Sequence, residues 1–100
     1  MANYLRILFV SARPEGLAPL EAGHREQLER LRAEGRLIAT FELADGEGYV
    51  EAFHAADRHE AEALTGESPL VAGGACSWIL KRCEADSGSG FVASGGDTKL

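Results

Sequence analysis

Residues 20–35 carry a hydrophobic pattern with the period of an amphipathic helix. At about 100° per residue, one stripe of this helix collects its leucines and a histidine, namely Leu20, His24, Leu28 and Leu31. The charged side chains of the segment fall outside the stripe and are expected to face water. Pro19 before the helix and Gly35 after it are typical of helix boundaries. Because a titratable ring stands where the pattern favours leucine, His24 is the first candidate for a functional residue.

Four other segments have the patterns of β-strands. They are residues 3–11, 36–44, 49–55 and 75–83. The first is apolar on both faces, whereas the second directs its apolar side chains to one face. Between the second and third strands, Asp45-Gly46-Glu47-Gly48 predicts a hairpin turn, since glycine supplies the positive φ that such turns need. Asp57 and Glu60 form a capping-box pattern, which predicts a shorter helix ending at Gly66. Residues 67–74 are expected to form a loop.

The order of these segments predicts an α+β fold of the ferredoxin-like βαββαβ type. Right-handed crossovers place both helices on one face of a four-stranded antiparallel sheet. The opposite face is also apolar along residues 3–11, and the chain offers no further element to cover it. We therefore expect a homodimer through the sheet faces, which makes a dimeric α+β barrel. The domain is expected to span residues 1–86, and residues 87–100 to form a flexible or partner-docking C-terminal tail.

Composition narrows the classes of partner. The chain has 100 residues and a formal net charge of −6, so neither nucleic acid nor an anionic membrane is expected as a partner. The absence of a signal-peptide pattern and of a long apolar run favours a cytoplasmic protein. Cys76 and Cys83 fall on opposite faces of one predicted strand and are expected to be free thiols. His54 and His59 lack metal-ligand spacing, so neither a metal nor another cofactor is expected.

Several short motifs resemble a known family. The run His24-x3-Leu28-x2-Leu31-x3-Gly35-Arg36-Leu37 is followed by Asp45, by Gly48-x-Val50, by Glu60-Ala61 and by Ser68-Pro69-Leu70-Val71-Ala72-Gly73. Over residues 4–83, this series resembles the YciI-like (YCII-related) proteins of the dimeric α+β barrel superfamily. The resemblance implies that His24 and Asp45 form a catalytic pair. The chain departs from the family at Thr40-Phe41-Glu42, where Ala-Gly-Pro is usual, and at Ser68-Pro69, where Asp-Pro is usual. Both departures fall near the expected cavity.

The chemistry available to such a pair is proton transfer. A histidine titrates near neutral pH, and a neighbouring carboxylate orients its ring and raises its basicity. Isomerisation, lactone or enol chemistry and general-base hydrolysis are the reactions that these residues support. Two structural alternatives stay open: His24 bonded to a backbone carbonyl beneath the sheet, and Asp45 serving only to form the turn. Glu42 is the second candidate for the carboxylate.

Four residues are candidates for substrate binding. Phe41 and Trp78 are expected to line an aromatic pocket or, alternatively, the core or the dimer interface. Arg6 is a candidate for binding an anionic substrate, with a solvated or ion-paired arginine as the alternative, and Glu42 completes the set. Three functions stay open: a small-molecule isomerase or hydrolase, a non-catalytic small-ligand-binding or regulatory module, and, by superfamily analogy alone, a cofactor-free monooxygenase.

Overall fold

The computed structural model describes residues 1–11 and 15–84. The strands are β1 Ala2–Val10, β2 Leu37–Glu42, β3 Gly48–Ala55 and β4 Cys76–Cys83. The helices are α1 Leu17–Ala33, α2 Arg58–Glu67 and the short α3 Pro69–Ala72, and a 3-10 turn, η1 Ala44–Gly46, joins β2 to β3. The expected tail, residues 87–100, lies outside the described residues.

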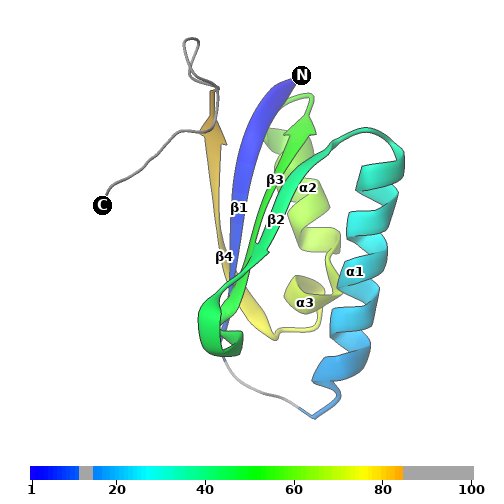
Figure 1. Ribbon diagram of the computed structural model, residues 1–100, viewed down its shortest axis with the longest axis vertical. Coiled ribbons are helices and arrows are strands. Elements are labelled where there is room, and N and C mark those ends of the chain that lie inside the picture. The colour runs from blue at the N-terminus through cyan, green and yellow to red at the C-terminus, as the bar shows by residue number, and fades with distance from the viewer. Residues whose placement is uncertain (12–14, 85–100) are drawn as a thin grey trace.

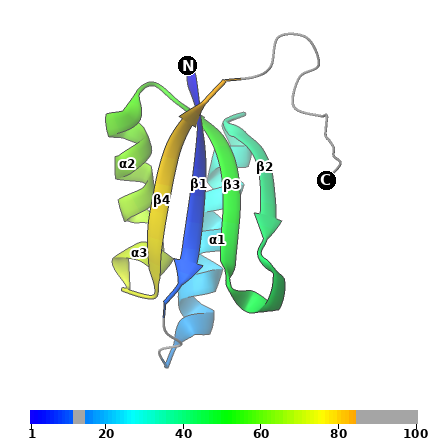
Figure 2. The ribbon, with the colours of Figure 1, turned by 90° about the vertical axis from the view of Figure 1, so that its left-hand side faces the viewer.

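The strands form one antiparallel sheet in the order β2-β3-β1-β4. Helices α1 and α2 pack on the same face of this sheet (Figures 1 and 2). The arrangement confirms the predicted ferredoxin-like βαββαβ fold. Strand β1 pairs with both β3 and β4, which agrees with its apolar pattern on both faces. Within the described part of the chain, no helix is long and apolar enough to span a membrane.

Two local features differ from the sequence prediction. Helix α1 begins at Leu17, so Pro19 is its third residue and does not precede it. The first helical turn leaves its N–H groups without intrahelical partners, so a proline there costs no hydrogen bond. Helix α3 occupies a segment that was expected to be a loop. It forms because the Oγ of Ser68 accepts a hydrogen bond from Leu70 N–H, and Pro69 takes the first helical position.

The core between the sheet and the helices is divided by a polar layer. Along β1, the helix-facing side chains are Tyr4, Arg6 and Leu8, all of them buried. Tyr4 belongs to one apolar cluster and Leu8 to another, and Arg6 lies between the two along the strand. The other buried polar residues are His24, Gln27, Glu51, Thr65 and Ser68. Buried polar groups are costly unless they are hydrogen-bonded, so this layer has to satisfy its own donors and acceptors.

The face of the sheet opposite the helices is apolar. Leu5 and Ile7 of β1 are half-buried there, and the register places Ile7 between Val50 of β3 and Ile79 of β4. Phe41 of β2 pairs with Val50 on the same face. Phe41 is 60% exposed and Ile79 is 43% exposed. A contiguous apolar surface of this kind is typical of an interaction site.

Candidate functional site

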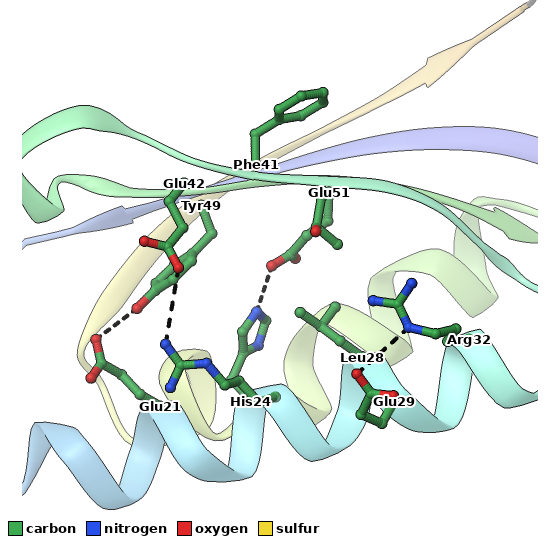
Figure 3. Close-up of a pocket in the computed structure, with 11 residues that line it drawn as sticks. Glu21, His24, Leu28, Glu29, Arg32, Phe41, Glu42, Tyr49 and Glu51 are labelled. Atoms are coloured by element: carbon green, nitrogen blue, oxygen red, sulfur yellow. Dashed lines mark hydrogen bonds and ion pairs between the residues drawn. The ribbon is translucent and has the colours of Figure 1, made fainter.

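The side chain of His24 on α1 points toward the helix-facing side of the sheet. His24 is 1% exposed. Its Nε2 lies 2.5 Å from Oε2 of Glu51 on β3 (Figure 3). Its Nδ1 lies 2.7 Å from Oγ of Ser68, the residue that caps α3. Both ring nitrogens therefore contact side chains, and neither is bonded to a backbone carbonyl.

A buried arginine supports Glu51 from the side opposite the histidine. Arg6 of β1 donates to Glu51 Oε1 through Nε at 2.8 Å, and its Nη2 lies 2.6 Å from the same oxygen. Nη2 also donates to Oε1 of Gln27 at 3.2 Å, and Gln27 Nε2 donates to the carbonyl of Leu64 at 2.7 Å. The guanidinium carbon lies 5.2 Å from the centre of the Phe53 ring. On the arginine side of the polar layer, the side chains of Arg6 and Gln27 are thus hydrogen-bonded to buried acceptors.

The electrostatics of the layer keep Glu51 charged. Burial alone disfavours the carboxylate, but the hydrogen bond from His24 and the nearby Arg6 guanidinium outweigh burial and hold the pKa of Glu51 below its usual range. Glu51 is therefore a carboxylate at neutral pH and can only accept hydrogen bonds. It follows that Nε2 of His24 carries a proton and donates it to Glu51.

A cavity of about 380 Å³ opens between α1 and strands β2 and β3. His24 and Glu51 line it together (Figure 3). The other side chains that line it are Glu21, Arg25, Leu28, Glu29, Arg32, Thr40, Phe41, Glu42 and Tyr49. Arg25 of α1 and Glu42 of β2 approach each other to 4.0 Å across the opening, and both are largely exposed. The cavity is therefore open to solvent at this ion pair, and His24 and Glu51 lie at its inner wall with almost no exposed surface.

Tyr49 lies beside the histidine in this cavity. The centres of the His24 and Tyr49 rings are 5.5 Å apart. The Tyr49 hydroxyl donates to Oε2 of Glu21 at 2.6 Å. Burial and the hydrogen bond with the Glu21 carboxylate raise the pKa of Tyr49. The phenol therefore keeps its proton at neutral pH and presents its free lone pair as an acceptor.

The structure does not bring Asp45 to His24, and the carboxylate at Nε2 is that of Glu51. Asp45 lies in η1, exposed, with a φ of 62°. A residue at positive φ is what the hairpin turn needs, and aspartate tolerates this backbone better than most residues. The interpretation of Asp45 as a residue that forms the turn therefore accounts for its place. Glu42, the second candidate, lines the cavity but approaches Arg25 and not the histidine.

The candidate substrate-binding residues lie in different places. Phe41 borders the cavity, but its ring points away from α1 (Figure 3). Trp78 lies on β4, at the edge of the sheet remote from β2, where it pairs with Leu8 of β1. It does not line this cavity. Arg6 is fully buried in its ion pair with Glu51 and stands behind the cavity wall, so the ion-paired alternative describes it. Within the described residues, no group of three or more histidine, cysteine or acidic side chains could hold a metal ion.

Sequence reasoning missed Glu51, although a signal for it existed. The inward positions of β3 are Tyr49, Glu51 and Phe53, so an acidic residue interrupts an aromatic face. Arg6 interrupts the inward face of β1 in the same way, and the two residues are direct partners in the register. Opposite charges at inward positions of adjacent strands predict a buried ion pair. Finding this pair from the sequence required the strand register, which a single sequence does not supply.

Comparison with known proteins places the fold. No family model and no curated protein matches the chain. Several solved structures resemble it, and two of them are described here. One is 5-chloro-2-hydroxyhydroquinone dehydrochlorinase (TftG) from Burkholderia phenoliruptrix AC1100 in complex with 2,5-dihydroxybenzoquinone, with a TM-score of 0.67 and 18% identity over 84% of this chain and 96% of that one. The other is muconolactone isomerase, with a TM-score of 0.66 and 16% identity over 94% of this chain and 98% of that one. At these identities the likenesses show the fold alone, a four-stranded antiparallel sheet with its helices on one face.

Proposed function

We propose that this protein is a small-molecule enzyme that transfers protons in the cavity between α1 and the sheet. The observation that carries the proposal is the 2.5 Å contact between His24 Nε2 and Glu51 Oε2 on the wall of a cavity open to solvent. A buried histidine paired with a carboxylate in a cleft is a typical acid–base arrangement. Both similar structures carry the names of enzymes, a dehydrochlorinase and an isomerase, which supports the same class of function.

The hydrogen-bond capacity of Glu51 defines how a ligand would meet this pair. A carboxylate offers about four acceptor positions. Arg6 donates a hydrogen bond to Oε1 through Nε, with Nη2 at ion-pair distance from the same oxygen, and His24 donates one to Oε2. Oε2 therefore keeps an acceptor position beside the histidine proton. A ligand hydroxyl or N–H group donating there would lie within reach of both proton carriers. The Glu51 carboxylate would accept that proton from the ligand and then deliver it to another atom of the substrate or to a leaving group, which regenerates the carboxylate, while the Nε2–H of His24 stays hydrogen-bonded to it.

One observation favours a non-catalytic binding module as the second candidate. Both ring nitrogens of His24 already contact buried side chains, Glu51 and Ser68. These two contacts join α1 to β3 and to the residue that caps α3, so His24 can stabilise the cavity wall without exchanging a proton. In that case the cavity would bind a small ligand without transforming it. The two candidate functions differ in whether removal of the His24 imidazole lowers turnover or changes ligand affinity alone.

The test is a turnover screen of small cyclic and carbonyl compounds with four variants. His24→Asn and Glu51→Gln remove the proton carriers, and the exposed residues His59 and Glu47 supply the matched controls His59→Asn and Glu47→Gln. For an acid–base enzyme, each site variant should lower the rate by roughly 10²- to 10⁴-fold, while the controls retain wild-type rates. If ligands bind and the site variants change only the dissociation constant, the binding-module function replaces the enzymatic one.

We also propose that the apolar sheet face pairs with that of a second copy. The face includes Leu5, Ile7, Val50 and Ile79, and a surface of this composition on a small domain is poorly tolerated in water. Two such faces packing together would bury it in an isologous interface. Sedimentation at micromolar concentration should then give twice the monomer mass of 10.7 kDa. Ile79→Lys should shift the species to monomer, and a monomeric wild-type protein would contradict the proposal.

A further inference from the structure

Ser68 joins the histidine to the backbone of α3. Its side chain is fully buried and does not line the cavity. Its Oγ accepts a hydrogen bond from Leu70 N–H at 3.3 Å and lies 2.7 Å from His24 Nδ1. The hydroxyl therefore serves two partners at once. One partner is the Leu70 N–H in the first turn of α3, and the other is Nδ1, the ring nitrogen of His24 that faces away from Glu51.

The positions of the protons along this chain of contacts follow from its acceptors. The Glu51 carboxylate requires a proton on His24 Nε2. If Nδ1 carries no proton, the Ser68 hydroxyl can donate to it, while its oxygen still accepts from Leu70 N–H. Every donor then has an acceptor. If Nδ1 is protonated as well, it donates to Ser68, and the serine hydroxyl hydrogen loses its acceptor in a place that solvent does not reach.

The charge balance of the layer points the same way. The charged groups that contact His24 or its partner are Glu51 from β3 and Arg6 from β1. Their charges cancel, so the layer is neutral when the histidine is neutral. Tyr49 beside the ring keeps its proton and adds no charge. Glu21, which accepts from Tyr49, and the exposed Arg25–Glu42 pair line the cavity outside the buried layer. A protonated histidine would leave one uncompensated positive charge in the core, which is costly.

We propose that Ser68 is a positioning residue that holds His24 as the neutral tautomer with its proton on Nε2. By occupying Nδ1, the serine fixes the ring so that its one proton is directed at Glu51 and the cavity. The role of this tautomer in catalysis rests on the proposed function, but the tautomer itself does not. The same site with aspartate at this position would behave differently, because a second carboxylate would favour the doubly protonated ring.

Two substitutions separate this role from a purely structural one. Ser68→Asp keeps a good helix cap for α3, since aspartate is among the preferred N-cap residues. It also adds a negative charge, so the layer becomes neutral only when His24 carries both protons. Ser68→Thr keeps the hydroxyl and should preserve the wild-type tautomer. A role limited to capping α3 predicts the same histidine spectrum in all three proteins.

The measurement is ¹⁵N NMR of the imidazole rings in histidine-labelled full-length protein at pH 7, with His24→Asn to assign the His24 signals. We expect a protonated Nε2 and an unprotonated Nδ1 in the wild type and in Ser68→Thr, and two protonated nitrogens in Ser68→Asp. A wild-type ring with a proton on Nδ1 would overturn the proposal, and so would a Ser68→Asp ring identical to the wild type. If Ser68→Asp fails to fold, the wild-type and Ser68→Thr spectra still decide the question.

The outcome is independent of the proposed enzymatic activity. If the expected tautomer is found and no substrate is turned over, the inference stands and the proposed function fails. If turnover is found, Ser68→Asp should change the pH profile of the rate, whereas Ser68→Thr should leave the profile in place. Turnover with an unchanged pH profile in Ser68→Asp would show that the serine does not act through the histidine.

Discussion

Removal of Arg6 tests whether the polar layer is held together as a unit. Arg6 is 0% exposed and Glu51 is 1% exposed, so neither charge has water as a substitute partner. Arg6→Met keeps an unbranched apolar stem but removes the guanidinium, which leaves the Glu51 carboxylate with His24 alone. Removing one partner of a buried ion pair costs about 3–5 kcal/mol. This is a large part of the roughly 5–15 kcal/mol that stabilises a typical domain.

A double variant tests whether the stability lost in Arg6→Met comes from the unpaired Glu51 charge. In Arg6→Met with Glu51→Gln, no uncompensated charge remains, and the glutamine oxygen can still accept the proton of His24 Nε2. The double variant should therefore be more stable than Arg6→Met alone, although it lacks one more native group. The control is Arg32→Met, which breaks an exposed pair with Glu29 and should cost at most about 1 kcal/mol.

The assay is urea unfolding at pH 7 followed by the fluorescence of Trp78, the single tryptophan of the chain. Thermal melting provides a second readout, since 1 kcal/mol shifts the midpoint of a domain of this size by about 4–8 °C. If the effects of Arg6→Met and Glu51→Gln simply add in the double variant, the two residues are energetically independent. That result would refute the view that the arginine neutralises the carboxylate beside the histidine.

Three further predictions concern stability and exchange. The folded-state pKa of Glu51 lies below its ordinary value of 4.5. The ionised carboxylate therefore contributes its full stabilisation above pH 4.5 and loses it as the pH falls through the folded-state pKa. In acid unfolding titrations, the stability advantage of the wild type over Glu51→Gln should shrink accordingly. His24→Leu should lower the free energy of unfolding by about 1–3 kcal/mol in urea titrations, since it removes the hydrogen-bond partner of Glu51 Oε2 and of the Ser68 hydroxyl hydrogen. An unchanged or higher stability would show that the contacts of the ring contribute nothing. The amides of β1 should be among the slowest in hydrogen exchange, and early exchange throughout residues 4–10 would contradict its central place.

The fold could be predicted because its signals are local. The apolar stripe that contains Leu28 and Leu31, the alternation of the strands and the glycines of the β2–β3 turn each act over a few residues. Helix α3 was missed because its segment, with Pro69 and two glycines, has the composition of a loop. The cap from the buried Ser68 and Pro69 at the first helical position together make the segment helical.

The candidate site could be predicted in part. His24 stood out because it breaks an apolar stripe, and the structure shows it at the wall of the cavity. Its partner Glu51 could not be assigned, because the pairing joins α1 to β3 across 27 positions and depends on how the helix lies on the sheet. Asp45 satisfied a motif, but its local conformation is explained by the turn. Local rules thus identified the unusual residue, and tertiary packing determined its neighbours.

The central claim is that the cavity at the His24–Glu51 pair binds a small molecule. The most direct measurement is an NMR screen of small hydroxylated and carbonyl compounds that follows the ring signals of His24 and Tyr49. A parallel screen with Leu28→Trp tests the location, since the larger side chain would occupy part of the cavity that Leu28 lines. We predict compounds that shift both rings in the wild type and lose this effect in Leu28→Trp. If no compound moves either ring, or if the shifts persist unchanged in Leu28→Trp, the cavity is not the binding site.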